Sequence, residues 1–182
     1  MKKVLFLGDL HLPFVDLDAF ELAKRVITTW KPHAVIQVGD LLDNRALKRH
    51  TDAPHVFTSL KYDNVLSEAL FESLDDACVA AGVKKKAITL GNHDTYLDRY
   101  LKEEAIALHD YADTLDPVAL IGAEKRGWLV KPYRDALEIG KVSVIHDVTL
   151  SGPTAVTRAA SVYGGSVVFG HTHAAGIMYT GD

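Results

Sequence analysis

The stretch Ile88-Thr89-Leu90-Gly91-Asn92-His93-Asp94 indicates the fold of this chain more clearly than any other. Its three apolar-rich residues before Gly91 are typical of a buried strand. Gly91 permits a sharp turn where that strand ends. We therefore expect Asn92, His93 and Asp94 at the C-terminal tip of a strand, where open α/β sheets place their binding sites. An amide oxygen, an imidazole and a carboxylate together suit a metal ion and a proton transfer.

Four other clusters of polar side chains follow short apolar runs in the same way. They are Asp9 and His11 after residues 4–7, Asp40 after residues 34–38, His146 after residues 142–145, and His171 and His173 after residues 167–169. Two side chains at positions i and i+2 face the same side of an extended backbone, so one cation can take both. Taken alone, Asp9 is equally typical of a turn or a helix cap.

Three further side chains have two interpretations each. Asp43 either orients a metal ligand from behind or caps a helix over residues 44–49. Arg45 opens a basic patch that is either solvated or in contact with a substrate phosphate. Arg99 either pairs with Glu103 on a helix surface or contacts a phosphate. The rest of the basic patch consists of Lys48, Arg49, His50 and His55.

The segments between the clusters alternate between helix and strand patterns. Apolar periodicity predicts helices at 17–30, 59–81, 95–109 and 153–162, and a strand near 128–130. Residues 136–139 and 142–145 flank Gly140-Lys141, which predicts a β-hairpin and hence one antiparallel strand pair. The continuous apolar run at 4–7 predicts a central buried strand. The run Lys84-Lys85-Lys86 is typical of a solvated surface.

Length and composition predict one ordinary globular domain over residues 1–182, with 48% hydrophobic residues. A net charge of −4 gives no overall basic footprint for nucleic acid. Cys78 is the single cysteine, which excludes an intramolecular disulfide and suits a reducing compartment. Asp9 and His11 interrupt the apolar start too early for a signal peptide, and no apolar run approaches a membrane span. A cytoplasmic protein without a membrane partner is expected.

The side chains at the five tips offer nitrogen and oxygen ligands and no thiolate. This set fits Mn, Fe, Zn, Co or Ni better than a structural zinc site. The tips carry too many ligands for one ion, so we expect two divalent ions about 3.5–4 Å apart that share one carboxylate. Asp40 is the candidate for that bridge, and such metal pairs hydrolyse phosphate esters.

The complete series resembles the signature of the calcineurin-like metallophosphoesterases, in the order of that family. It comprises Asp9-x-His11, Gly39-Asp40-x-x-Asp43, Gly91-Asn92-His93-Asp94, His146 and Gly170-His171-Thr172-His173. Residues 92–101 also resemble compact phosphoesterases common in bacteriophage genomes. The resemblance implies two stacked mixed β-sheets flanked by helices, a four-layer αββα sandwich.

The same resemblance implies roles for these residues. Asp9, His11, Asp40 and His173 would hold the first metal, and Asp40, Asn92, His146 and His171 the second. His93 would donate to the leaving-group or phosphoryl oxygens, with Asp94 setting its orientation. A hydroxide between the metals, Mn being the favoured ion, would attack a phosphate mono- or diester in line. Asn44-Arg45 and Asp94 replace the Arg-Gly and Glu of the protein phosphatases in this family, which disfavours that activity.

Two other functions compete with this phosphoesterase hypothesis. One is a DNA or RNA nuclease that uses the same site, although the acidic net charge and the lack of interleaved aromatic and basic residues disfavour it. The other is a catalytically inactive metal-binding scaffold. The presence of His93 beside a full set of expected ligands argues against that scaffold.

Overall fold

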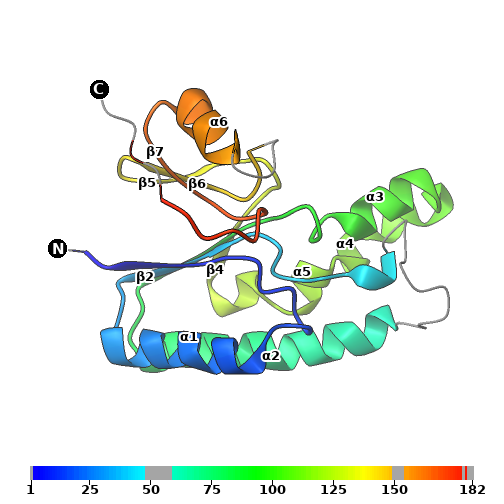
Figure 1. The fold of residues 1–182 in the computed structure, drawn as a ribbon. Helices are drawn as coiled ribbons and strands as arrows, with labels where there is room; N and C mark the ends of the chain where they lie inside the picture. The colour runs from blue at the N-terminus through cyan, green and yellow to red at the C-terminus, as the bar shows by residue number, and fades with distance from the viewer. Residues whose placement is uncertain (1, 48–58, 149–153, 178, 180–182) are drawn as a thin grey trace.

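The computed structural model describes residues 2–47, 59–148, 154–177 and 179, and its strands form two sheets (Figure 1). The first sheet has the order β1 (Val4–Leu7), β2 (Ala34–Val38), β3 (Lys85–Thr89) and β4 (Trp128–Lys131), all parallel. The second has the order β5 (Leu137–Ile139), β6 (Val142–Ile145) and β7 (Ser166–Phe169). Strand β6 is antiparallel to β5 and parallel to β7. The expected hairpin and the strand near 128–130 are confirmed.

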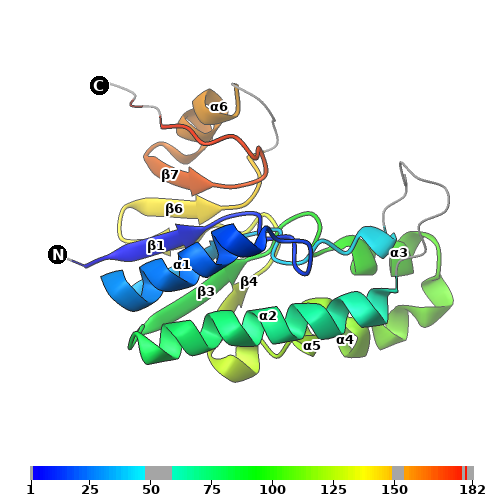
Figure 2. The same ribbon diagram turned by 60° about the horizontal axis from the view of Figure 1, so that its bottom comes forward.

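Helices cover the outer face of each sheet (Figures 1 and 2). Helices α1 (Leu17–Trp30) and α2 (Leu60–Ala80) lie on the first sheet, and α6 (Thr154–Tyr163) lies on the second. The remaining helical segments are η1 (Arg45–Leu47), α3 (Tyr96–Glu103), η2 (Ile106–Tyr111), α4 (Ala112–Leu115), α5 (Pro117–Leu120) and η3 (Glu124–Arg126). The single helix expected over 95–109 therefore ends at Glu103, where Glu103 and Glu104 are unfavourable at the negative end of a helix dipole.

Three apolar clusters show that the layers stack as helix, sheet, sheet and helix. Val35 and Ile88 pack towards α1 and α2 together with Phe71 of α2. Ile36, on the opposite face of β2, packs against Val144 of the second sheet. A third cluster joins Ile145 to Ala155 and Ala159 of α6. This alternation follows from the two-residue period of a strand and confirms the expected four-layer αββα sandwich.

Two local expectations were wrong. Strand β1 lies at the edge of the first sheet rather than in its centre, and its residues are only partly buried. Its apolar run reflects the two layers that cover it, because Leu5 packs towards the helices and Phe6 towards the second sheet. Lys86 is not a solvated surface residue, since its side chain is 13% exposed.

Lys86 belongs to a polar contact that joins α2, β3 and β4 inside the helical layer. Its Nζ donates to Asp75 Oδ1 at 2.5 Å and to the Arg126 carbonyl at 2.6 Å. The Trp128 indole N–H donates to the same Asp75 oxygen at 2.7 Å. A buried ammonium requires such partners, because an unpaired charge in the interior is strongly destabilising.

The first prediction concerns this contact. Asp75→Asn leaves the Lys86 ammonium without its counter-charge, which we expect to cost about 3 kcal/mol. For a chain of this size the melting temperature should fall by about 6–12 °C, as measured by circular dichroism. Asp76→Asn removes the same charge from the exposed side of α2 and serves as the control. Equal melting temperatures for the two variants would contradict the role of Asp75.

Candidate metal centre

The polar side chains expected at the strand tips meet at one end of the two sheets. In the described part of the chain, three groups of histidine and aspartate side chains have ligand atoms within 4.8 Å of one another. The groups are Asp9, His11 and His173; His11, Asp40 and His93; and Asp40, His146 and His171. Each group draws on segments distant in sequence, so the site forms only when both sheets are in place.

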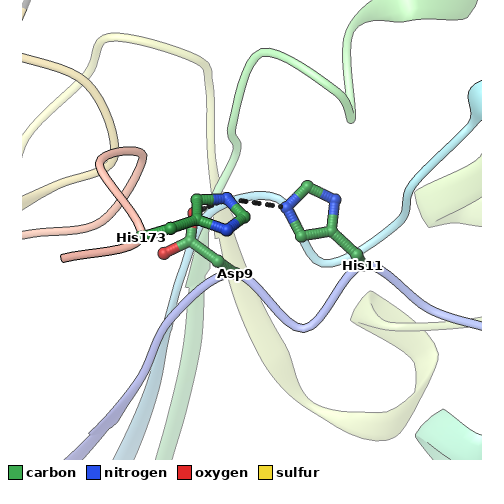
Figure 3. Close-up of side chains that lie close together, drawn as sticks. All are labelled: Asp9, His11 and His173. Atoms are coloured by element: carbon green, nitrogen blue, oxygen red, sulfur yellow. Dashed lines mark hydrogen bonds and ion pairs between the residues drawn. The ribbon is translucent and has the colours of Figure 1, made fainter. Parts of the chain in front are cut away.

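The first group brings two imidazole nitrogens face to face beside a carboxylate (Figure 3). His11 Nε2 lies 3.2 Å from His173 Nε2, and His173 Nε2 lies 3.7 Å from Asp9 Oδ1. His11 Nδ1 lies 3.1 Å from Asp43 Oδ1, so Nδ1 carries the proton that it donates to this carboxylate. In a neutral ring that leaves a lone pair on Nε2, which points at the other ring and suits a shared cation.

The third group, Asp40, His146 and His171, is centred on the fully buried His146. Its Nδ1 donates to the Val38 carbonyl at 2.8 Å, so Nε2 is the ring nitrogen that faces the site. Nε2 donates to Asp40 when the ring is protonated and becomes a metal ligand when a cation replaces that proton. Nε2 lies 3.2 Å from Asp40 Oδ2 and 3.2 Å from Asn92 Oδ1. His171 Nδ1 approaches the same Asn92 oxygen at 3.0 Å. An amide oxygen, a carboxylate and two imidazoles thus converge, which is a donor set that divalent transition metals accept.

Asp40 is buried and remains ionised. Burial alone would raise its pKa, but hydrogen bonds and charge from His146, together with the His93 backbone N–H, outweigh burial and hold the pKa below the usual value. The His93 N–H donates to Asp40 Oδ1 at 2.8 Å, while Oδ2 faces His146 and lies 3.8 Å from His11 Nε2. The single oxygen Oδ2 therefore lies between a histidine of each ligand group, which is where the oxygen of a bridging carboxylate would have to lie.

The backbone at the tips adopts a conformation that non-glycine residues rarely take. Positive φ values of 48° to 68° occur at Asp9, His11, Asp40, His171 and His173. Such residues cost about 1–3 kcal/mol each and persist only where their surroundings hold them. All five belong to the expected ligand set, so the strain is concentrated at the site.

Glycines at three tips are required by close packing, and Gly39 is also required by its positive φ of 79°. A Cβ on Gly91 would overlap with the Asp40 carboxylate and backbone nitrogen, although the φ of Gly91 is not positive. A Cβ on Gly39 would overlap with the His146 ring, and one on Gly170 would press on the Val38 carbonyl and the Asp9 carboxylate. The sequence argument for Gly91 as a conformational requirement is therefore corrected to a requirement for space.

His93 is held by Asp43 rather than by Asp94. His93 Nδ1 lies 2.8 Å from the Asp43 carbonyl oxygen and 3.3 Å from its carboxylate. Asp43 also contacts His11, so its position fits the expectation that it orients neighbouring rings more closely than the alternative of a helix cap.

The expected role of Asp94 in orienting His93 is corrected by its contacts. The buried Asp94 carboxylate accepts backbone N–H groups of Leu41 at 3.3 Å, Leu42 at 2.9 Å and Gly91 at 2.8 Å. Burial raises its pKa to about 6 despite these bonds. Asp94 therefore ties the tip of β3 to the loop after β2, because these three bonds all come from backbone N–H groups of those two segments.

Arg45 and Arg99, the expected substrate contacts, lie outside the three groups. The Arg45 guanidinium stacks on Phe14 with Cζ 3.3 Å from the ring centroid. The Arg99 guanidinium lies 4.6 Å from the Tyr96 ring centroid, and the Tyr96 ring lies 4.6 Å from that of His93. The other members of the basic patch lie outside the described residues.

Sequence reasoning missed Phe14, Tyr96 and Tyr133. Tyr96 stands three residues after His93, and this spacing could have placed the two rings side by side on a helical turn. The Tyr133 hydroxyl donates to Asp147 at 2.7 Å and so supports the loop that carries His146. Phe14 and Tyr133 reach their partners through the fold alone, and no local signal marks them.

None of the helices in the described ranges combines the length and hydrophobicity needed to cross a bilayer.

Two bacteriophage proteins are similar to this chain over almost its whole length. The Gene 54 protein of Mycobacterium phage D29 is 27% identical over 183 residues, which cover 97% of this chain and 71% of that protein. The Gene 54 protein of Mycobacterium phage L5 is 26% identical over 187 residues, with the same two shares. These names specify no substrate.

A family model described as calcineurin-like phosphoesterase matches residues 2–175, which include all five tips. The resemblance seen in the sequence is thereby confirmed. Divalent metal ions are implied by this family, and the three groups of histidine and aspartate side chains could bind them. The chain belongs to the calcineurin-like phosphoesterases, a family of metal-dependent hydrolases that act on phosphate esters.

Proposed function

We propose that this chain hydrolyses phosphate mono- or diesters at a centre of two divalent transition-metal ions, with Mn²⁺ as the favoured ion. The observation that carries the proposal is the pair of ligand groups on either side of Asp40. Each group offers two imidazoles and a carboxylate, and Asp40 presents one oxygen towards the His146 side while its other oxygen is fixed by a backbone N–H. Such an arrangement suits two cations that share one carboxylate.

The protons on Nδ1 of His11 and His146 determine which ring nitrogens can bind the two ions. His11 and His146 each give Nδ1–H to an oxygen, so each keeps Nε2 free in its neutral form. Asp9, His11, Asp40 and His173 would hold one ion, and Asp40, Asn92, His146 and His171 the other. Bound there, the ions would supply Lewis-acid activation of water and neutralise the charge of the phosphoryl group.

His93 would serve as the general acid. The carbonyl of Asp43 can only accept, so His93 Nδ1 donates to it, and Nε2 is the nitrogen that would protonate the leaving-group oxygen. The Asp43 carboxylate lies 3.3 Å from the same Nδ1 and helps to orient the ring. In this role His93 would give a proton from Nε2, and Asp43 would hold the ring in place.

Hydrolysis of bis-p-nitrophenyl phosphate with added Mn²⁺ tests the proposal directly. A panel of monoesters, diesters, cyclic nucleotides and oligonucleotides then identifies the preferred ester. Turnover separates the enzyme from an inactive metal-binding scaffold. Absence of turnover on every ester, with both ions bound, would overturn the proposed function.

The second prediction concerns the number of ions. Metal analysis after Mn²⁺ loading and gel filtration should give two ions per chain, because the two groups need separate cations. At an Mn²⁺ concentration about 100 times the dissociation constant, each ion should add about 2.7 kcal/mol of stability and raise the melting temperature. His146→Ala should lose one ion, whereas His109→Ala, outside all three groups, should keep both. One ion or none in the unmodified protein would contradict the two-metal proposal.

The third prediction concerns His93. His93→Ala should keep both ions while slowing hydrolysis of an ester with a poor leaving group by about 10²–10⁴-fold, the usual contribution of general acid catalysis. The loss should be smaller for p-nitrophenyl esters, because p-nitrophenolate leaves without a proton. A variant that hydrolyses the poor-leaving-group ester at the unmodified rate would refute the acid role. Loss of an ion would instead make His93 a ligand, since it lies within reach of His11 and Asp40.

The fourth prediction concerns Gly91. Gly91→Ala forces a methyl group against Asp40, and such overpacking costs about 1–3 kcal/mol. We expect a lower melting temperature and weaker Mn²⁺ binding by calorimetry, because Asp40 must move. Gly8→Ala places its methyl group in open space at a non-positive φ and is the matched control. Similar Mn²⁺ affinities for both variants would show that the contact with Asp40 does not position the site.

A further inference from the structure

Two arginines near His93 stack on aromatic rings, and the charge of one of them, Arg45, also acts on the Asp63 carboxylate without forming a salt bridge. We define the arginine rim as Phe14, Arg45, Tyr96 and Arg99. Arg45 stacks on Phe14, Arg99 stacks on Tyr96, and the segment η1 that begins at Arg45 packs against α3, which carries Tyr96 and Arg99. Within the ranges that the structure describes, neither guanidinium forms a salt bridge, and the buried Nε of Arg45 has no hydrogen-bond partner. Stacked guanidinium groups keep their N–H edges available for anions.

The rim is continuous with the proposed general acid. The Tyr96 ring stacks on the His93 ring at 4.6 Å with an interplanar angle of 31°, and Asn44 Nδ2 donates to the His93 carbonyl at 3.1 Å. Arg45 follows Asn44 in the chain, so both arginines lie next to elements that fix His93. Because His93 would protonate the leaving-group oxygen, the body of the leaving group should extend over this rim.

We propose that the substrate is a single-stranded nucleic acid and that the arginine rim binds the phosphate next to the scissile bond. This inference rests on the proposed function, since it assigns the leaving group of that reaction. Two guanidinium groups next to the elements that fix the acid suit a substrate with further negative charges, and a phosphodiester chain carries one at every nucleotide. Arginine stacked on an aromatic ring is also a common support for bases and phosphates of single strands.

The sequence lacks interleaved aromatic and basic residues, which disfavoured nucleic-acid binding, but the fold brings such residues together in the arginine rim. Phe14 and Arg45 are 31 positions apart and meet only in the fold, and Tyr96 and Arg99 meet through the i, i+3 spacing of α3. A phosphotyrosine peptide would also offer an aromatic leaving group. It would not provide a second phosphate for the rim, so nucleic acid accounts for both arginines.

The experiment compares substrates that differ by single phosphates. Steady-state kcat/KM per scissile bond is measured with Mn²⁺ for dT2, dT3 and dT4, with bis-p-nitrophenyl phosphate as the reference. We expect kcat/KM to rise about 10-fold from dT2 to dT4, the contribution of one charge-assisted hydrogen bond. In Arg99→Gln this rise should shrink, and the salt slope of log kcat/KM on dT4 should flatten by about 0.7, the value for one lost phosphate contact on a single strand.

The variants separate binding at the rim from general damage. Arg25→Gln removes the same charge from the exposed face of α1 and should keep both the length dependence and the salt slope. Arg99→Lys keeps the charge and should therefore keep the salt slope. Melting curves confirm that each variant is folded. Tyr96→Leu removes the ring under Arg99 and should lose the length dependence.

Different outcomes would overturn phosphate binding at the arginine rim and the proposed phosphoesterase activity. Equal kcat/KM for dT2 and dT4, or an equal loss on all substrates in Arg99→Gln, would overturn the rim while leaving the phosphoesterase proposal intact. Faster hydrolysis of a phosphotyrosine peptide than of dT4 would also overturn the nucleic-acid inference. No turnover of bis-p-nitrophenyl phosphate or of any oligonucleotide would overturn the proposed function itself.

Discussion

The buried carboxylate of Asp40 is the constraint on which the rest of the structure depends. Its oxygens are fixed by the His93 backbone N–H of the first sheet and by His146 of the second. Gly91 must lack a side chain so that the β3 tip can approach this carboxylate, and Gly39 must lack one so that the His146 ring fits beside it. A buried carboxylate needs paired and hydrogen-bonded surroundings, so one acidic residue dictates how closely the two sheets meet.

The site is assembled against the preferences of its own backbone and side chains. Positive φ values at Asp9, Asp40 and His171, together with acidic side chains packed close together, all oppose folding. Asp94 offsets part of this cost because its carboxylate ties three backbone N–H groups of the loops after β2 and β3. The apolar layers supply the remainder, and cations at the site would relieve the repulsion between its carboxylates. Metal binding and folding stability should therefore be strongly coupled.

The sequence predicted the layers and the meeting of the five tips because both depend on local patterns. Buried strands give apolar runs, and parallel strands bring their C-terminal ends to one edge. The sequence-based predictions were wrong where a contact between distant segments decides the structure.

Asp94 follows His93 directly, yet its carboxylate accepts the backbone N–H groups of Leu41 and Leu42, and the His93 imidazole contacts Asp43 instead. Lys86 looked solvated because its partner Asp75 lies on another element. Likewise, both covered faces of β1 produce the apolar run that suggested a central strand.

The net charge of −4 is a poor guide to the substrate because it averages over a site that would be neutralised by its own ions. Asp9, Asp40 and Asp43 contribute three negative charges within the ligand groups or directly beside them. Two divalent cations would add four positive charges at that place, enough to balance these three carboxylates and the neighbouring Asp94. Arg45 and Arg99 lie beyond these groups and stack on aromatic rings. The charge that an anionic ester meets there is then set by the ions and the arginine rim, although the chain as a whole is acidic.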